Sequence, residues 1–228
     1  MSTAETAPVR PRDAGTLILL RSRAGGTEVL IGRRAARTRF MPGFFVFPGG
    51  AVEPGDTHVN PASALHPAIT VHARVAGRAP RARAIAIAAI RETLEETGLF
   101  VAAPGDVASS EPSWAGARAQ RLAPDLARLD FVGRAITPAP NRIRFHARFF
   151  VARADHCHGR LAGNGELLDL HWAPVESVRR LQVARVTSYM LERAVRVAAR
   201  PDDHRNASVL VSTRKGVKRV TVFVDEPH

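Results

Sequence analysis

Short apolar runs separated by turn-forming residues predict a series of β-strands along the chain. Thr16–Leu20 is a continuous apolar run, typical of a buried strand, and Gly25-Gly26 turns it into a hairpin with Glu28–Ile31. The other strands that this pattern predicts are Phe44–Phe47, a strand that starts at Leu99–Val101, Arg144–Ala152, Leu167–Trp172, and a hairpin of Ser208–Val211 and Val220–Val224 across Lys215-Gly216. The aromatic residues of the strand 144–152 are interpreted as core.

Helical segments are predicted between these strands. The run Arg81–Thr97 begins with many Ala and Ile residues, and its ends carry helix signals. Pro80 suits a first helical turn, and Gly98 suits the left-handed position just past a helix end. The other predicted helical segments are Trp114–Leu129, broken around Pro124, and the amphipathic run Val178–Ala199.

The order of these elements mixes strands and helices, so the expected fold class is α/β, in the sense of an α+β protein. Residues 1–13 are rich in Pro and Ala and are expected to be a flexible N-terminus, and residues 14–228 are expected to form a single domain. Residues 57–80 are interpreted as an insertion loop with a short strand at Ala68–Val71, and residues 200–228 as a C-terminal hairpin. For a loop of this length, both a lid and a passive excursion stay open.

The composition of the 228 residues is that of a globular protein with one strong bias. The formal net charge is +12, and arginine carries nearly all of the positive charge, since Lys215 and Lys218 are the only lysines. This excess is explained either by a compositional bias, since Ala and Arg are abundant along the whole chain, or by anionic partners such as phosphorylated small molecules. Charge without a recognisable motif does not indicate specific nucleic-acid binding. The lone Cys157, the lack of a signal peptide and the lack of a membrane-length apolar run predict a cytoplasmic protein without a membrane partner.

An acidic cluster within the predicted helix 81–97 is the first candidate for chemistry. At about 100° per residue, Glu92, Glu95 and Glu96 share one arc of the helix. Arg91 lies four residues before Glu95, at the spacing of an ion pair. Like charges at helical spacing repel unless a cation offsets them, and Mg²⁺ prefers carboxylate oxygens. The cluster therefore indicates either a metal site or a solvated acidic helix face.

A glycine-rich turn upstream supplies a second part of the pattern. Phe47–Gly50 (FPGG) leads to Asp56, and glycines there let the backbone approach a ligand closely. Together with Arg91–Leu99 (RETLEETGL), this stretch resembles the Nudix box of the Nudix hydrolases. Asp56 and Thr93 stand where the family has a glutamate and an aliphatic residue, and residues 57–90 place 34 residues where the family has seven.

The resemblance implies the Nudix fold, a mixed β-sheet sandwiched between helices, here with an insertion inside the box. It also implies a hydrolase that uses Mg²⁺ or Mn²⁺ to neutralise a diphosphate and to activate water. The metal ligands that it implies are Glu92, Glu96, Glu95 and the backbone carbonyl of Gly49. The catalytic residues that it implies are Glu95, Arg91 as an organiser of the carboxylates, and Glu166 as a carboxylate from outside the box, with Asp169 as second choice.

A second resemblance lies just before the glycine turn. Arg34-Ala35, Arg39 and Gly43 have the spacing of a signature found in coenzyme A pyrophosphatases. It implies that Arg34 and Arg39, with Gly50, bind a phosphorylated substrate, since arginine makes bidentate contacts to phosphate. The implied reaction cleaves coenzyme A or acyl-coenzyme A to 3′,5′-ADP and (acyl-)phosphopantetheine.

Two other functions stay open on the sequence alone. The first is a Nudix hydrolase of another nucleoside diphosphate derivative, such as ADP-ribose, NADH or a dinucleotide. The second is a Nudix-like binding module without catalysis, although the intact acidic residues of the box argue against it. The sequence also leaves open whether the protein is a monomer or a homodimer.

Overall fold

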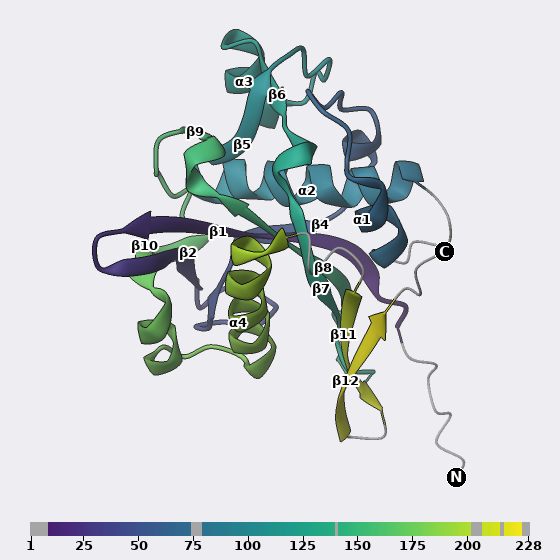
Figure 1. The fold of residues 1–228 in the computed structure, drawn as a ribbon, viewed down its shortest axis with the longest axis vertical. Coiled ribbons are helices and arrows are strands. Elements are labelled where there is room, and N and C mark those ends of the chain that lie inside the picture. Colours follow the sequence, from purple (N-terminus) through teal and green to yellow (C-terminus); the bar gives the residue numbers. More distant parts are fainter. Residues whose placement is uncertain (1–8, 74–78, 140, 202–206, 215–216, 225–228) are drawn as a thin grey trace.

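The computed structural model describes residues 9–73, 79–139, 141–201, 207–214 and 217–224, which form a large mixed sheet held between helices (Figure 1). The strands are β1 Arg12–Arg23, β2 Gly26–Arg34, β3 Phe45–Val46, β4 Gly49–Ala51, β5 Leu99–Pro104, β6 Leu122–Pro124, β7 Asp130–Ile136, β8 Phe145–Arg153, β9 Cys157–Gly159, β10 Leu167–Pro174, β11 Ala207–Arg214 and β12 Val217–Val224. The α-helices are α1 Pro67–His72, α2 Ala79–Thr97, α3 Ala115–Ala119 and α4 Arg185–Ala199. Short 3₁₀ helices cover Pro54–Thr57, Pro112–Trp114, Leu126–Arg128, Ala154–His156 and Val175–Arg180.

The large sheet has nine strands within the described residues. Its order is β10-β2-β1-β8-β7-β11-β12, with β3 paired to β2 and β4 paired to β1. β1 runs parallel to β8, and β11 runs parallel to β7, whereas the other neighbours are antiparallel. A smaller sheet has the order β6-β5-β9. A mixed sheet between helices confirms the fold class that the sequence predicts.

The central position of β1 explains its continuous apolar run. Leu17 and Leu19 belong to the core on the side of α2, whereas Ile18 and Leu20 belong to the core on the side of α4. Successive side chains of a strand point to opposite faces. A strand that is covered on both faces therefore has to be apolar at every position.

Most predicted strands are confirmed, with shifted ends. The predicted strand Phe44–Phe47 shrinks to Phe45–Val46, and the predicted C-terminal hairpin extends to eight register pairs between β11 and β12. Its turn at Lys215-Gly216 lies outside the described residues. So do residues 1–8 of the expected flexible N-terminus, whereas β1 already begins at Arg12.

The short strand predicted at Ala68–Val71 is wrong, because these residues belong to the helix α1. Pro67 takes the first helical position, and Nδ1 of His66 accepts a hydrogen bond from the Ala68 N–H at 3.2 Å. Proline at the start and a side-chain cap both favour helix initiation. These end signals outweigh the strand preference of the β-branched residues between them.

Two predicted helices are shorter than expected. Of Trp114–Leu129, only Ala115–Ala119 is α-helical, because Leu122–Pro124 pairs with β5 as a strand. Of Val178–Ala199, the helix begins only at Arg185. Before it, Val175–Arg180 forms a 3₁₀ helix, and the short extended segment that follows accepts a hydrogen bond at 2.9 Å from the Phe45 N–H to the Gln182 carbonyl. In both places, part of the predicted helix pairs with a distant strand instead.

The described part of the insertion 57–80 packs onto the body of the protein. Val59 and Ile69 are buried in the core on the side of α2, and α1 lies against α2 and β7 (Figure 1). The Asn60 N–H donates to the Val107 carbonyl at 3.1 Å, and Ser63 hydrogen-bonds to Asp125. Residues 74–78 lie outside the described residues. Among the helices that are described, none has the length and apolar character to cross a membrane.

Candidate active site

α2 carries the acidic cluster and lies very close to β1. A Cβ at Gly15 of β1 would collide with the Ile85 carbonyl and with Ala89, so only glycine permits this approach. Ile87 and Ile90 are fully buried in the core on the side of α2. The acidic end of α2 is thereby fixed against the neighbouring strand β4, which pairs with β1.

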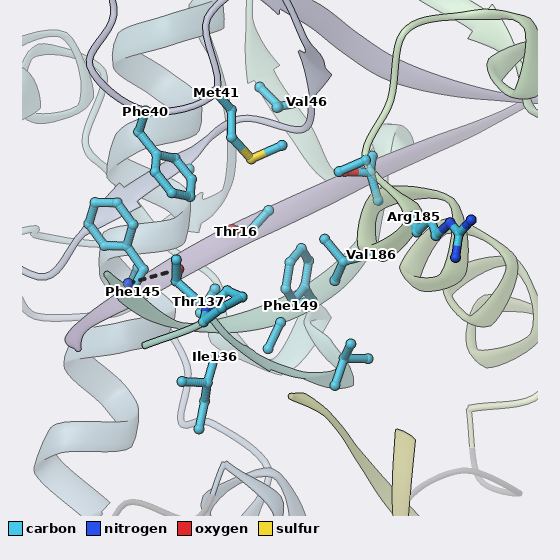
Figure 2. Close-up of a pocket in the computed structure, with 18 of the residues that line it drawn as sticks. Thr16, Phe40, Met41, Val46, Ile136, Thr137, Phe145, Phe149, Arg185 and Val186 are labelled. Atoms are coloured by element: carbon cyan, nitrogen blue, oxygen red, sulfur yellow. Dashed lines mark hydrogen bonds between the residues drawn. The ribbon is translucent and has the colours of Figure 1, made fainter. Parts of the chain in front are cut away.

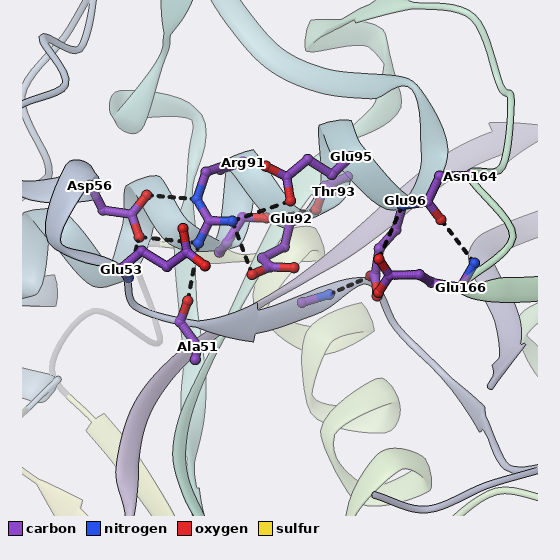
Figure 3. Close-up of polar contacts among 12 residues, drawn as sticks. Ala51, Glu53, Asp56, Arg91, Glu92, Thr93, Glu95, Glu96, Asn164 and Glu166 are labelled. Carbon is purple, nitrogen blue, oxygen red and sulfur yellow. Dashed lines mark hydrogen bonds and ion pairs between the residues drawn. The ribbon is translucent and has the colours of Figure 1, made fainter. Parts of the chain in front are cut away.

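The two parts of the box meet where β4 passes the end of α2 (Figure 3). The Gly49 N–H donates to Glu96 Oε2 at 2.9 Å. Next to it, a Cβ at Gly50 would overlap the carboxyl group of Glu92. Glycine at this position therefore leaves the space that the Glu92 carboxylate occupies.

Arg91 is buried and connects α2 to the segment predicted as a glycine-rich turn, whose residues Gly49–Ala51 are the strand β4 in the structure (Figure 3). Its Nε and Nη2 donate to the Asp56 carboxylate at 2.8 and 3.2 Å, and Nη2 also donates to the Ala51 carbonyl at 3.0 Å. Its Nη1 donates to Glu92 Oε1 at 3.0 Å and to Glu95 Oε2 at 3.3 Å. The Arg91 and Asp56 side chains are only 5% and 1% exposed. Arg91 therefore occupies the place of an organiser of the carboxylates.

Burial raises the pKa of two carboxyl groups in this cluster. Desolvation raises the pKa of Glu92 to about 7, against the lowering influence of the Arg91 charge. Desolvation also raises the pKa of Glu96 to about 8, although the hydrogen bond from Gly49 favours its charged form. The negative charge of Glu166 adds to both shifts. Two desolvated carboxylates are costly in their charged form, so a bound cation would stabilise this site at neutral pH.

The donor set fits a hard divalent cation. Glu92 and Glu96 offer carboxylate oxygens of the kind that Mg²⁺ prefers, and Mg²⁺ completes its shell with water and substrate phosphate. Within the part of the chain that the structure describes, no group of three acidic, His or Cys side chains is arranged to hold a metal. Glu95 is 35% exposed at its side chain and contacts Arg91. Its role as a ligand, and that of the Gly49 carbonyl, stay predictions.

Glu166 lies beside the buried carboxylates, whereas Asp169 does not. The charge of Glu166 affects the pKa of both members of the buried pair, which places it near them. Its backbone N–H donates to Asn164 Oδ1 at 2.9 Å just before β10 begins (Figure 3). Asp169 instead forms an exposed ion pair with Arg33 at 2.7 Å. Of the two acids proposed from the sequence, Glu166 is the one that lies near Glu92 and Glu96.

A cavity of about 430 Å³ adjoins the glycine turn (Figure 2). Its wall is largely apolar, and the rings of Phe40 and Phe145 meet edge to face with centroids 5.2 Å apart. Gly49 and Gly50 line the side next to the carboxylates, and Val186 lies on the side of α4. The described residues that line the cavity include no aspartate or glutamate. The cavity therefore suits an uncharged or anionic part of a ligand.

The two predicted substrate arginines differ in position. Arg34 lines the cavity, and its guanidinium carbon lies 5.9 Å from the ring centroid of Phe40. Its Nε is buried and has no hydrogen-bond partner among the described residues. Its charge also acts on Glu96, so Arg34 lies between the cavity and the carboxylates. Arg39 is exposed and is not part of the described cavity wall.

The apolar wall of the cavity was not predicted. Phe145 and Phe149 line the cavity, whereas Phe150 belongs to the core on the side of α2. Period-two alternation along the predicted strand 144–152 could have separated these two faces. The sequence alone could not show that one of the faces is left open as a cavity.

Solved structures connect this fold and site to a family. No family model matches the chain. A NUDIX hydrolase from Alicyclobacillus acidocaldarius is 30% identical, with a TM-score of 0.61, and the match covers 81% of this chain and 90% of that chain. A mutator MutT protein from Bacillus halodurans is 14% identical, with a TM-score of 0.50, and covers 92% of this chain and 97% of its own, which indicates a shared fold.

The chain belongs to the Nudix hydrolases. It is therefore a hydrolase that acts on diphosphate bonds, and enzymes of this family generally use divalent metal ions, typically Mg²⁺.

Proposed function

We propose that this protein is a metal-dependent pyrophosphohydrolase of coenzyme A or acyl-coenzyme A, which yields 3′,5′-ADP and (acyl-)phosphopantetheine. The observation that supports it best is the position of Arg34. This arginine begins the coenzyme A-type signature, lines the cavity next to Gly49 and Gly50, and keeps a buried Nε without a partner among the described residues. An unpaired guanidinium donor next to buried carboxylates suits a phosphate of the substrate.

In this proposal, Glu92 and Glu96 hold the metal, with Glu95 and the Gly49 carbonyl as further ligands. A bound Mg²⁺ or Mn²⁺ would neutralise the diphosphate and activate water. Glu166 accepts the proton of the attacking water, because this carboxylate from outside the box lies near the two metal-binding carboxylates, Glu92 and Glu96.

Two arginines have different roles in the same scheme. Arg91 is a positioning residue, since its donors are occupied by Asp56, Ala51 and the neighbouring glutamates. Arg34 contacts the substrate diphosphate, while Gly50 forms the cavity wall next to it and leaves room for the Glu92 carboxylate. The apolar cavity then receives an uncharged part of the substrate, the adenine ring or the pantetheine chain.

Product analysis tests the proposal. The protein is incubated with Mg²⁺ and, in parallel, with coenzyme A, acetyl-coenzyme A, ADP-ribose, NADH and a dinucleoside polyphosphate. Release of 3′,5′-ADP, fastest from the coenzyme A compounds, is the expected result. Cleavage of ADP-ribose or NADH alone would retain the Nudix chemistry and overturn the coenzyme A assignment. No cleavage of any compound, with Mn²⁺ also tried, would favour a binding module.

A pair of arginine variants tests the role of Arg34 in the same assay. Arg34→Ala removes a charge-assisted hydrogen bond of about 1.5–3 kcal/mol, which corresponds to a loss of roughly tenfold to a hundredfold in kcat/KM. Arg37→Ala is the matched control, because Arg37 is exposed and does not line the cavity. Equal activity of the two variants would remove Arg34 from the substrate site.

A further inference from the structure

β12 is the terminal strand of the large sheet. It pairs with β11 on one side, and no described strand pairs with its other side. The β11–β12 pairing keeps one continuous register over eight residues, and β12 contains no proline. Proteins often protect such edges with proline, a bulge or a covering segment, because a regular edge offers a row of unpaired N–H and C=O groups to another strand.

One face of β12 carries exposed valines. Val220 and Val222 are 47% and 57% exposed, whereas their cross-strand neighbours Val211 and Val209 are 4% and 0% exposed. Directly paired residues share one face of a sheet. The two exposed valines therefore lie on the same face of the sheet as the core on the side of α4, but no described residue covers them to the same extent.

The hairpin has a short attachment to the rest of the sheet. β11 pairs with β7 only at Leu210 and Val211, although β11 and β12 pair over their full length. Figure 1 shows the hairpin projecting from the body beyond α4. An isolated two-stranded ribbon is marginally stable in water, whereas additional strands with an apolar face stabilise it.

We propose that β12 pairs antiparallel with β12 of a second copy of this chain, and that the protein is a two-fold symmetric dimer with one sheet continuous across both copies. A second copy suits this edge because the strand is complementary to itself. A two-fold axis at Thr221, perpendicular to the sheet, sets Val220 opposite the partner's Val222, so the two uncovered valine pairs form one cluster.

The charges of β12 are compatible with the same pairing. Lys218 and Arg219 lie in the N-terminal half of the strand, and its C-terminal half from residue 220 to residue 224 has no charged residue. Antiparallel pairing places the cations of each copy opposite the uncharged half of the other, so like charges do not face each other. The hairpin also lines the cavity with Ser212, Thr213 and Lys218, so the dimer would brace one wall of that cavity.

Sedimentation velocity of the full chain over the micromolar range tests the dimer. The expected mass is twice the chain mass of 24.7 kDa. Val222→Lys should raise the dimer dissociation constant by at least about tenfold, because it places a charge in the shared valine cluster. Val71→Lys is the matched control, since Val71 is another valine with 59% exposure, and it lies on α1, which packs on the other face of the sheet from the valine pairs.

A second variant distinguishes a weakened dimer from a misfolded edge strand. The double change Val220→Thr and Val222→Thr keeps β-branched side chains, and it should also weaken the dimer while circular dichroism stays that of the parent protein. A monomer at every concentration of the unchanged protein would overturn the proposal. A folded Val222→Lys protein that stays as dimeric as Val71→Lys would overturn it too, because the dimer would then use another surface.

Discussion

Replacing Glu96 by glutamine separates the charge of this side chain from its packing. Glutamine has nearly the same shape, and its amide oxygen can still accept the hydrogen bond that the Gly49 N–H gives to Glu96 at 2.9 Å. The change removes a negative charge from a residue that is only 4% exposed. We expect Glu96→Gln to fold, to lose metal-dependent turnover, and to be more stable than the metal-free parent protein.

The pKa of Glu96 sets the size of the stability difference. Burial raises this pKa from 4.5 to about 8, so between these pH values the folded protein holds a proton that the unfolded chain has released. The free energy of unfolding of the parent protein therefore falls as pH rises through this window. The difference, 8 − 4.5 = 3.5 pH units, corresponds to at most about 5 kcal/mol above the window. Glutamine does not titrate and avoids this loss.

Urea unfolding with a chelator present, at about pH 5 and about pH 9, measures the effect on either side of the window. The stability gap between Glu96→Gln and the parent protein should widen at the higher pH. Mg²⁺ should then stabilise the parent more than the variant, because metal binds the deprotonated carboxylate. Glu95→Gln is the matched control for the measurement with chelator, since the Glu95 side chain is 35% exposed.

Two results would refute this reasoning about Glu96. A gap that does not change with pH would mean that the carboxyl group is not strongly desolvated. Full metal-dependent activity of Glu96→Gln would mean that the metal is held elsewhere.

Three other changes test the rest of the site. Arg91→Ala leaves the buried Asp56 carboxylate without its partner, so urea unfolding should show a loss of about 3–5 kcal/mol; parent-like stability would contradict the anchoring role. Gly50→Ala places a methyl group against the Glu92 carboxyl and should lower kcat by roughly a hundredfold, as measured by product release, while a fully active variant would show that the contact is dispensable. Glu166→Gln should still bind Mg²⁺ in calorimetry and should lower kcat about 10²–10⁴-fold, and an unchanged kcat would assign the base to another group.

The elements with local signals were predictable from the sequence. Pro80, the Ala- and Ile-rich run and Gly98 mark the start, body and end of a helix, and the structure has α2 at Ala79–Thr97 with Gly98 at φ 72°. The shared arc of its carboxylates follows from helical spacing alone. The strand at Thr16–Leu20 was predictable for a similar reason, because its residues Leu17–Leu20 are buried on both faces of the sheet and are all apolar.

The elements that depend on distant partners were not predictable in this way. Leu122–Pro124 is a strand because β5 supplies its hydrogen bonds, and the helix α4 starts late because Phe45 pairs with the chain before it. The same limit applies to the arginines of the coenzyme A-type signature. Arg34 ends β2 and is held at the cavity, whereas Arg39 lies on the loop that follows, and their spacing in the sequence does not reveal this difference.

The two parts of the box are joined by hydrogen bonds between residues far apart in the sequence, Gly49 with Glu96 and Asp56 with Arg91. The site therefore does not depend on the length of the chain between the two parts. If that spacer were a flexible tether, lengthening it from seven residues to 34 would cost only about 1.4 kcal/mol of loop-closure entropy. This is less than the roughly 3–5 kcal/mol expected for breaking the buried Asp56–Arg91 pair. The part of the spacer that precedes α2 can therefore change in length or acquire a helix of its own, as it has with α1, while the reaction centre keeps its geometry. In evolution and in engineering, new sequence fits best at exposed positions of this part such as Val71, because Val59 and Ile69 pack into the core.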